Sequence, residues 1–419
     1  MRFFRMMSRL LNRILWGAFA GMLLAWGCRI PEVPVFHDKS QGILYDTAME
    51  ADLRSGKSPA LLQTAYVAYV DTLAEPVAVT AWSEESSAWE IFVGTNRGVW
   101  DEDADPNRVL TDARFGRATV TLPRHIKPPR SGMVLPWRKD AVEEKVPAVT
   151  SAPVTAETFL DGVRDQLERS RQHDLLLFVH GFNVSFDQAL ISTANLALKM
   201  PFNGAVATYC WPTQGGVSNY SGDEPINKQS VAPFSAFLQT LREGVPDETR
   251  ITILVHSMGN RIVMEALDAM PTPRGLKPFA QVVLCAPDVG RGDFERWAPG
   301  VITQSERVSL YSNASDTALI ASKGLHSEAR AGDAWRPLLV EGIEAVDCSR
   351  VDLTFMGHSY FGENRDVLSD LFMLVKEQRP AKDRPHLERR ENSTGAEYWS
   401  FQRTAPAILC TWHFDELSR

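Results

Sequence analysis

The sequence has few cysteines, no excess of basic residues and no long membrane-spanning apolar run, and each shortage excludes a class of protein. Five cysteines in 419 residues, with no CxxC pair, indicate neither a small disulfide-stapled domain nor a paired-cysteine metal site. Forty-four Lys and Arg against 52 Asp and Glu leave a net charge of −8, so nucleic acid is not an expected partner. The composition, 44% apolar and 23% charged, is that of a globular protein with one large domain or several smaller ones.

The first 28 residues have the layout of an export signal. Four arginines precede Ile14–Trp26, an uncharged stretch of 13 residues, whereas a spanning helix needs about 20. Leu24–Cys28 (LAWGC) resembles a bacterial lipoprotein cleavage box, in which the cysteine is acylated, although Trp26 is bulky where a small residue is usual. We therefore expect an extracytoplasmic protein held at the membrane through Cys28. Simple secretion and an uncleaved anchor or cytoplasmic protein are the alternatives.

From about Asp174 onward, short apolar runs alternate with amphipathic segments. The runs are continuously apolar, as in parallel strands covered on both faces, and apolar residues three and four apart mark the helices between them. This alternation predicts a doubly wound α/β fold with a mostly parallel sheet and helices on both faces. The predicted strands are Leu175–Val179, Ala205–Cys210, Ile251–Val255, Val282–Cys285, Val308–Tyr311 and Ile343–Val346.

The chain before this part is predicted to extend the sheet. Val77–Trp82, Glu90–Gly94 and Arg117–Leu122 have the pattern of strands, which we expect to be antiparallel and at the edge. Residues 126–155 hold five prolines and many charges, which predicts an exposed connection. The expected divisions are a signal at 1–28, a linker or helical lead-in at 29–75, an α/β domain at 76–378 and a tail at 379–419.

One predicted strand runs directly into a small-residue turn that carries a serine. Ile251–Asn260 (ITILVHSMGN) places Ser257 at a strand-to-helix corner, the geometry that exposes a nucleophilic hydroxyl above a sheet edge. Gly259 occupies the second glycine position of this nucleophile elbow, while Val255 replaces the first. A serine that only caps a helix would give the same local pattern. Ser257 is therefore a nucleophile candidate that needs support from elsewhere in the chain.

A second predicted strand ends in a polar, glycine-containing turn, HGFN. At this place an α/β-hydrolase supplies one amide of its oxyanion hole, and the residue after the nucleophile supplies the other. We therefore expect the amides of Phe182 and Met258 to form the hole. His180 is expected to brace the loop rather than to act as the base, and an ordinary capped turn is the alternative. The other residues of this turn that are expected to line the site are Gly181 and Asn183.

An acid and a histidine follow the serine in the order that this fold requires. Asp316 and His358 each come after a predicted strand, so both are expected at the carboxyl edge of the sheet, where ligands bind. Asp288, one strand earlier, is a rival acid. Asp316 also fits the cap of a following helix, and His358 also fits a buried, hydrogen-bonded histidine. The sequence alone leaves these alternatives open.

Six motifs taken together resemble the bacterial α/β-hydrolases of unknown function grouped as the DUF900 family. They occur in the order FVHGFN, YCWP, LVHSMGNR, LCAPDV, LYSNASDTAL and GHSYF, over about residues 85 to 375. The resemblance implies the α/β-hydrolase fold and the triad Ser257, Asp316 and His358. It also implies that Val255 is acceptable at the elbow. It implies no substrate.

These residues predict serine-dependent acyl transfer with no metal or organic cofactor. His358 would take the proton from Ser257, and Asp316 would orient the imidazole. A small-molecule or lipid ester at the cell envelope is the expected substrate, because of the predicted location. A catalytically silent scaffold that binds an envelope component, and an acyltransferase, are the alternatives.

The polar segment Thr213–Asp223 leaves the same sheet edge and follows Trp211. Tyr220 is therefore expected near the substrate cleft, and Trp211 is expected to be an aromatic residue of the core or of the cleft wall. A solvated connection with no role in binding is an equally good interpretation of this segment.

Overall fold

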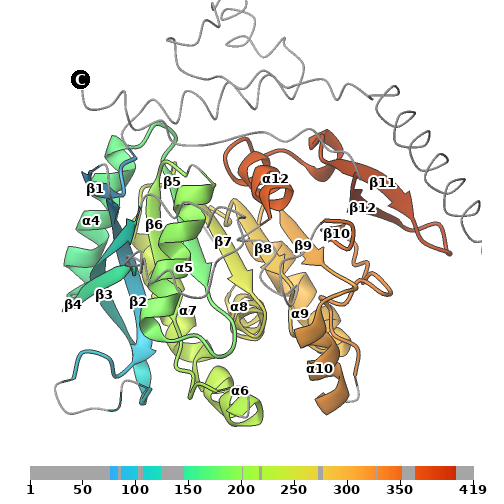
Figure 1. Cartoon of the computed structure of the whole chain (residues 1–419), viewed down its shortest axis with the longest axis horizontal. Coiled ribbons are helices and arrows are strands. Elements are labelled where there is room, and N and C mark those ends of the chain that lie inside the picture. The colour runs from blue at the N-terminus through green and yellow to red at the C-terminus, as the bar shows by residue number, and fades with distance from the viewer. Residues whose placement is uncertain are drawn as a thin grey trace, which may run out of the picture.

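The fold is a single mixed sheet with helices on both faces, known from a computed structural model (Figure 1). The structure describes residues 76–83, 86–101, 105, 107–123, 146–200, 202–216, 219–271, 277–326, 328–351 and 364–402. The predicted signal with Cys28, the lead-in at 29–75 and the segment that contains His358 lie outside the described residues. None of the described helices is both long enough and apolar enough to cross a bilayer.

The order of elements alternates between strand and helix through the middle of the chain. The strands are β1 (Val79–Trp82), β2 (Ser86–Arg97), β3 (Val109–Pro123), β4 (Ala148–Val154), β5 (Asp174–Val179), β6 (Ala205–Cys210), β7 (Arg250–His256), β8 (Gln281–Cys285), β9 (Val308–Ser312), β10 (Ile343–Asp347), β11 (Leu387–Glu391) and β12 (Glu397–Phe401). The helices are α4 (Ala156–Arg169), α5 (Phe186–Lys199), α6 (Tyr220–Gln229), α7 (Val231–Gly244), α8 (Gly259–Ala269), α9 (Arg291–Gln304), α10 (Thr317–His326), α12 (Arg365–Val375) and the short η3 (Ala381–Asp383).

Within the described residues, twelve strands form one sheet. Their order is β11-β12-β10-β9-β8-β7-β5-β6-β2-β3-β4, and β1 pairs with β2 outside this path. All neighbours from β12 to β2 are parallel, while β11, β3, β4 and β1 pair antiparallel at the two ends. The mostly parallel α/β class predicted from the alternating pattern is confirmed.

The continuous apolar runs are explained by burial on both faces of the sheet. In β5, Leu176 and Phe178 pack in one cluster with α5 and α12, while the alternate residues Leu175, Leu177 and Val179 pack in a second cluster with α4, α7, α8 and α9. Every residue of β5 is buried. At roughly 1.5–3 kcal/mol for each fully buried leucine, these strands contribute strongly to the hydrophobic stabilisation of the fold.

Two local predictions at the amino-terminal side of the sheet were wrong. Residues 148–154, expected within an exposed connection, form the edge strand β4, whose side chains are mostly exposed and so carry no apolar signal. The segment around Glu90–Gly94, expected at an antiparallel edge, is part of β2, which lies inside the sheet and is parallel to β6. Ile91, Phe92 and Val93 are all fully buried, as an internal position requires.

The tail continues the sheet at its other end. β12 runs parallel to β10, and β11 closes the edge as a hairpin with β12. The described part of the predicted tail therefore packs on the α/β domain instead of extending away from it.

The chain reverses its direction of winding between β5 and β7, and this reversal makes a crevice. From β5 the chain moves to β6 on one side, whereas from β7 it moves to β8 on the other. The helices that follow the two strands, α5 and α8, pack on opposite faces. The loops after adjacent strands therefore diverge, and open α/β sheets bind ligands at such a point.

Candidate active site at the carboxyl ends of β5 and β7

Ser257 lies in the turn between β7 and α8, in a backbone conformation that side chains rarely adopt. Its φ is 52°, in the left-handed region, and the residue is only 4% exposed. A left-handed residue other than glycine costs about 1–3 kcal/mol and persists only where its surroundings enforce it. The strain fits the sharp corner that the sequence predicted for a nucleophile elbow.

The two glycine positions of the elbow differ in the space that they leave for a side chain. A Cβ on Gly259 would lie 2.4 Å from the carbonyl oxygen of His180, so the second position needs glycine. Val255, at the first position, is still inside β7, pairs with Val179 and Leu284, and is fully buried in the core. A valine fits there because the position still belongs to the strand and its side chain is part of the buried core.

The loop after β5 lies directly against the serine. A Cβ on Gly181 would lie 2.8 Å from Cβ of Ser257 and 3.1 Å from Nδ1 of His256. Within the described part of the chain, neither the amide of Phe182 nor that of Met258 donates to a protein acceptor. The predicted loop and serine are therefore brought together by β5 and β7.

His180 is buried and holds this loop by hydrogen bonds. Its Nδ1–H donates to the carbonyl of Gly181 at 2.8 Å, and its Nε2 accepts from Nη2 of Arg97 at 3.5 Å. Burial, and then the charge of Arg97, lower the pKa of His180 to about 3. The ring is thus neutral at ordinary pH, with its proton on Nδ1, as expected for a bracing residue.

Trp211 is part of the same support. Its ring stacks on that of His180, with centroids 5.3 Å apart and planes 7° apart, and its indole N–H donates to the carbonyl of His180 at 2.8 Å. Trp211 is fully buried, so it orients the loop from the core instead of lining an open cleft.

Arg97, at the end of β2, was not identified from the sequence. Its side chain is buried and donates to the carbonyls of Trp211 at 2.8 Å and Val184 at 2.7 Å. Burial lowers the pKa of Arg97 to about 10. The only sequence signal was an arginine at the end of a strand, a place where arginine is usually solvated.

Asn183 ties the loop after β6 to the loop after β5. Its φ is 56°, and its Oδ1 accepts from the amide of Gly216 at 2.6 Å. The segment after Trp211 was expected to be a loop through Asp223, but α6 begins at Tyr220. Tyr220 places its ring 5.2 Å from that of Phe182, so α6 contacts the predicted oxyanion loop.

Asp288 is at the centre of a polar network beside Ser257, to whose carbonyl its amide donates at 3.2 Å. Its carboxylate accepts from Ser322 at 2.6 Å and from the phenol of Tyr220, it forms an ion pair with Nε of Arg330 at 3.1 Å, and Nη2 of Arg261 lies 3.5 Å away. Burial and the carboxylate of Asp288 raise the pKa of Tyr220, which keeps the phenol protonated as the donor. The carboxylate of Asp288 is thus occupied by groups from α6, α8 and α10.

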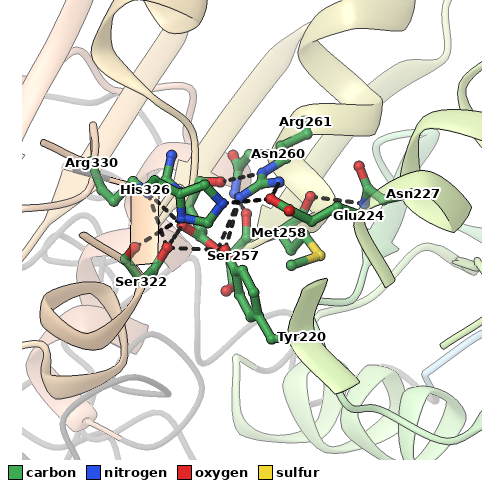
Figure 2. A network of polar contacts seen from close by, with 11 residues as sticks. Tyr220, Glu224, Asn227, Ser257, Met258, Asn260, Arg261, Ser322, His326 and Arg330 are labelled. Atoms are coloured by element: carbon green, nitrogen blue, oxygen red, sulfur yellow. Dashed lines mark hydrogen bonds and ion pairs between the residues drawn. The ribbon is translucent and has the colours of Figure 1, made fainter. Parts of the chain in front are cut away.

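The same network holds α6 against its neighbours. Glu224 on α6 accepts from Nη1 of Arg261 at 2.6 Å and contacts Nε2 of His326 at 2.6 Å. The carboxylate accepts, so the ring nitrogen donates. Burial opposes ionisation of Glu224, but the bonds from Arg261 and His326 outweigh it and leave the pKa of Glu224 below its ordinary value. Figure 2 shows these side chains grouped around the turn that carries Ser257.

Asp316 lies at the carboxyl end of β9, as predicted, and it caps α10. It is 1% exposed, and its Oδ1 accepts from the amide of Leu319 at 3.0 Å. A carboxylate has two oxygens with several acceptor sites, so capping a helix and orienting a histidine are compatible roles. The predicted base, His358, lies outside the described residues.

No group of three His, Cys, Asp or Glu side chains in the described ranges is arranged to hold a metal ion. A cavity of about 360 Å³ lies near the first residues of β9 and β10, lined in part by Glu306 and Trp399. It is at the amino ends of these strands and therefore at the edge of the sheet opposite to Ser257.

A strained serine follows β7, and a glycine-containing loop follows β5, the neighbouring parallel strand. This arrangement defines an α/β-hydrolase scaffold. The DUF900 family, described as alpha/beta hydrolases of unknown function, matches residues 156–377, more than half of the chain. The protein belongs to this family, which confirms the resemblance seen in its motifs. A search of curated proteins finds no match.

Proposed function

We propose that this protein is a serine hydrolase that cleaves an ester or related acyl bond with Ser257 as the nucleophile. The observation that carries the proposal is the left-handed backbone of Ser257, pressed against the glycine loop at Gly181. A serine that only capped α8 would not need this conformation, because cap residues are ordinarily extended.

In the proposed reaction, His358 accepts the proton of the Ser257 hydroxyl as the oxygen attacks the acyl carbon. Asp316 orients the imidazole and stabilises its cation. His358 then gives this proton to the alcohol, which leaves. Water, which loses a proton to His358, attacks the acyl-enzyme, and Ser257 takes that proton back as the acid is released. The position of Asp316 at the end of β9 supports its role, and the full set of partners around Asp288 argues against that residue as the acid.

The amides of Phe182 and Met258 would bind the oxyanion. The proposal is supported by the closeness of their loops and by the lack of a protein acceptor for either amide within the described residues. Each such donor is worth roughly 3–4 kcal/mol of transition-state stabilisation in other acyl-transfer enzymes.

Labelling with a fluorophosphonate probe tests the proposal. The wild-type protein should react, and Ser257→Ala and His358→Ala should not. Asp316→Asn should lower kcat by about 10⁴-fold while Asp288→Asn should not, because only an orienting acid fixes the tautomer of the base. Folded but unlabelled wild-type protein would instead favour a catalytically silent binding scaffold. Product analysis with an added alcohol separates hydrolysis from acyl transfer to that alcohol.

We further propose an extracytoplasmic, membrane-held protein that acts on small-molecule or lipid esters of the envelope. This rests on the arginines and the uncharged stretch before Cys28. Cys28→Ser should release a lipoprotein into the soluble fraction, and an unchanged membrane fraction would reject acylation at that residue.

A further inference from the structure

The direction of a backbone N–H is set by whatever holds the carbonyl of the same peptide unit. The unit is planar and trans, so its C=O and N–H point in opposite directions. The two proposed oxyanion donors, Phe182 and Met258, share their units with the carbonyls of Gly181 and Ser257. A side chain that holds either carbonyl therefore aims the donor on its other side.

The carbonyl of Ser257 is held by three donors. Nδ2 of Asn260 donates at 2.8 Å, the amide of Asn260 at 3.1 Å and the amide of Asp288 at 3.2 Å. Nδ2 of Asn260 also lies 3.4 Å from the carbonyl of Cys285, which accepts the amide of Ser257 at 3.0 Å. The Asn260 side chain thus joins the turn to the end of β8 and fixes the plane that carries the amide of Met258.

The carbonyl of Gly181 is held in the equivalent way. Nδ1–H of His180 donates to it at 2.8 Å, which directs the amide of Phe182 to the opposite side. Arg97, which donates toward Nε2 of His180, favours the tautomer with the proton on Nδ1. Stacking on Trp211 then fixes the ring itself.

The Asn260 amide is not an optimal choice for stability. The residue is fully buried, and its Oδ1 has no hydrogen-bond partner in the part of the chain that the structure describes. A buried, unsatisfied polar group costs roughly 1–3 kcal/mol, whereas leucine has nearly the same shape and no polar atom. Local departures from the most stable choice are expected at functional sites.

We propose that Asn260 and His180 are positioning residues that aim the two oxyanion donors, Met258 and Phe182, by holding the carbonyls of their peptide units. The proposal rests on the proposed acyl-transfer function. Neither side chain touches the substrate. They contribute by holding the donors in place before the reaction. Donors held in this way stabilise the negative oxygen of the transition state more than the neutral carbonyl of a bound ester.

Asn260→Leu tests the first half of the proposal in the full-length protein. With a p-nitrophenyl ester, kcat should fall about 10–100-fold with KM little changed, which is less than the 10²–10³-fold expected for loss of a donor. Inhibition by a boronic acid, whose serine adduct is a negatively charged, tetrahedral boronate, should weaken by the same factor as kcat/KM. The unfolding temperature should be equal to or above that of the wild type. If Asn260→Leu does not fold, Asn260→Ser, which is smaller than asparagine, takes its place in the same measurements.

Asn227→Leu is the matched control. Asn227 is a buried asparagine whose Nδ2 donates at 3.1 Å to the carbonyl of Met258, one peptide unit further along. That unit carries the amide of Gly259, which is not a proposed donor. Asn227→Leu should therefore keep kcat and boronate affinity near the wild-type values.

His180 is tested by comparing two substitutions. Nδ2 of an asparagine is bonded to Cγ as Nδ1 of histidine is, so His180→Asn retains a donor near the carbonyl of Gly181, and His180→Leu does not. His180→Asn should recover kcat relative to His180→Leu.

The outcomes separate the two proposals. A wild-type protein that hydrolyses the ester, with Asn260→Leu and His180→Leu equally active, would overturn the positioning role and leave the proposed function standing. Equal losses in Asn260→Leu and Asn227→Leu would also overturn it, because they would indicate general packing. A folded wild-type protein that neither hydrolyses nor labels would end both proposals.

Discussion

The first residue of α8 offers the sharpest test of how closely the two loops of the candidate site, after β5 and β7, approach each other. A methyl group on Gly259 would lie 2.4 Å from the carbonyl oxygen of His180 and 3.3 Å from Cγ1 of Val179. Carbon and oxygen atoms in close contact normally lie about 3.3 Å apart, so Gly259→Ala requires a movement of about 0.9 Å. The obstructing atom belongs to the backbone, and no rotamer change can remove it. The loop that carries Phe182 must therefore shift relative to Ser257.

This shift has two measurable effects. Overpacking of this kind costs about 1–3 kcal/mol of unfolding free energy, which would lower the unfolding temperature by roughly 2–4 °C per kcal/mol. A displacement of about 1 Å in a catalytic arrangement can lower the rate about 10²-fold, so kcat/KM for a p-nitrophenyl ester should fall by about that factor. The loss of activity should be far larger than the loss of folded protein at 25 °C.

Gly324→Ala is the control, because it adds the same methyl group to α10 where no atom lies within 4 Å. It should retain full activity and gain about 0.5–1 kcal/mol of stability. Thermal unfolding and steady-state kinetics on both variants complete the comparison. A Gly259→Ala protein with wild-type kcat/KM and an unchanged unfolding temperature would refute the reasoning about the contact between the loops.

Three further predictions concern the titratable groups around the site. Asp288→Asn should lower the free energy of unfolding in urea by about 3–5 kcal/mol, because buried Arg330 then lacks a counter-charge, and a loss below about 1 kcal/mol would contradict this. The pKa of Glu224 is lowered, so its ion pairs stabilise the fold above the ordinary carboxyl value of about 4.3 and are lost as the pH falls through the lower folded value. Glu224→Gln should thus be less stable than the wild type at pH 7, with the two unfolding curves converging in acid; a constant difference would argue against the ion pairs as the cause. The pKa of His180 is about 3, so the acid limb of kcat/KM between pH 5 and 8 should be the same in His180→Asn, and a displaced limb would show that His180 titrates there.

The strands and the elbow were predictable because their signals are local. Continuous apolar runs such as Leu175–Val179 gave the parallel strands within a residue or two. The sharp strand-to-helix turn at Ser257 followed from small residues directly after such a run. The edge strand β4 was missed because its mostly exposed side chains, with Pro153 among them, follow no apolar pattern.

The partners of the buried charges could not be predicted in the same way. Asp288 was chosen as a rival acid from its place after a strand, but Tyr220, 68 residues earlier, and Ser322, 34 residues later, bind it. Arg97 meets His180 across 83 residues of chain. No local pattern marks which charged groups will meet when these segments pack.

The sequence by itself determined the α/β class, the strands of the central sheet and the corner at Ser257, because each depends on residues that are neighbours in the chain. Only the tertiary structure decided that β12 joins the sheet beside β10, that Arg97 contacts His180 and that Asn260 holds the carbonyl of Ser257. The physical reason is that the side chains of a strand themselves determine which of its faces can be buried. A hydrogen bond between distant segments, in contrast, forms only after the sheet has brought these segments together.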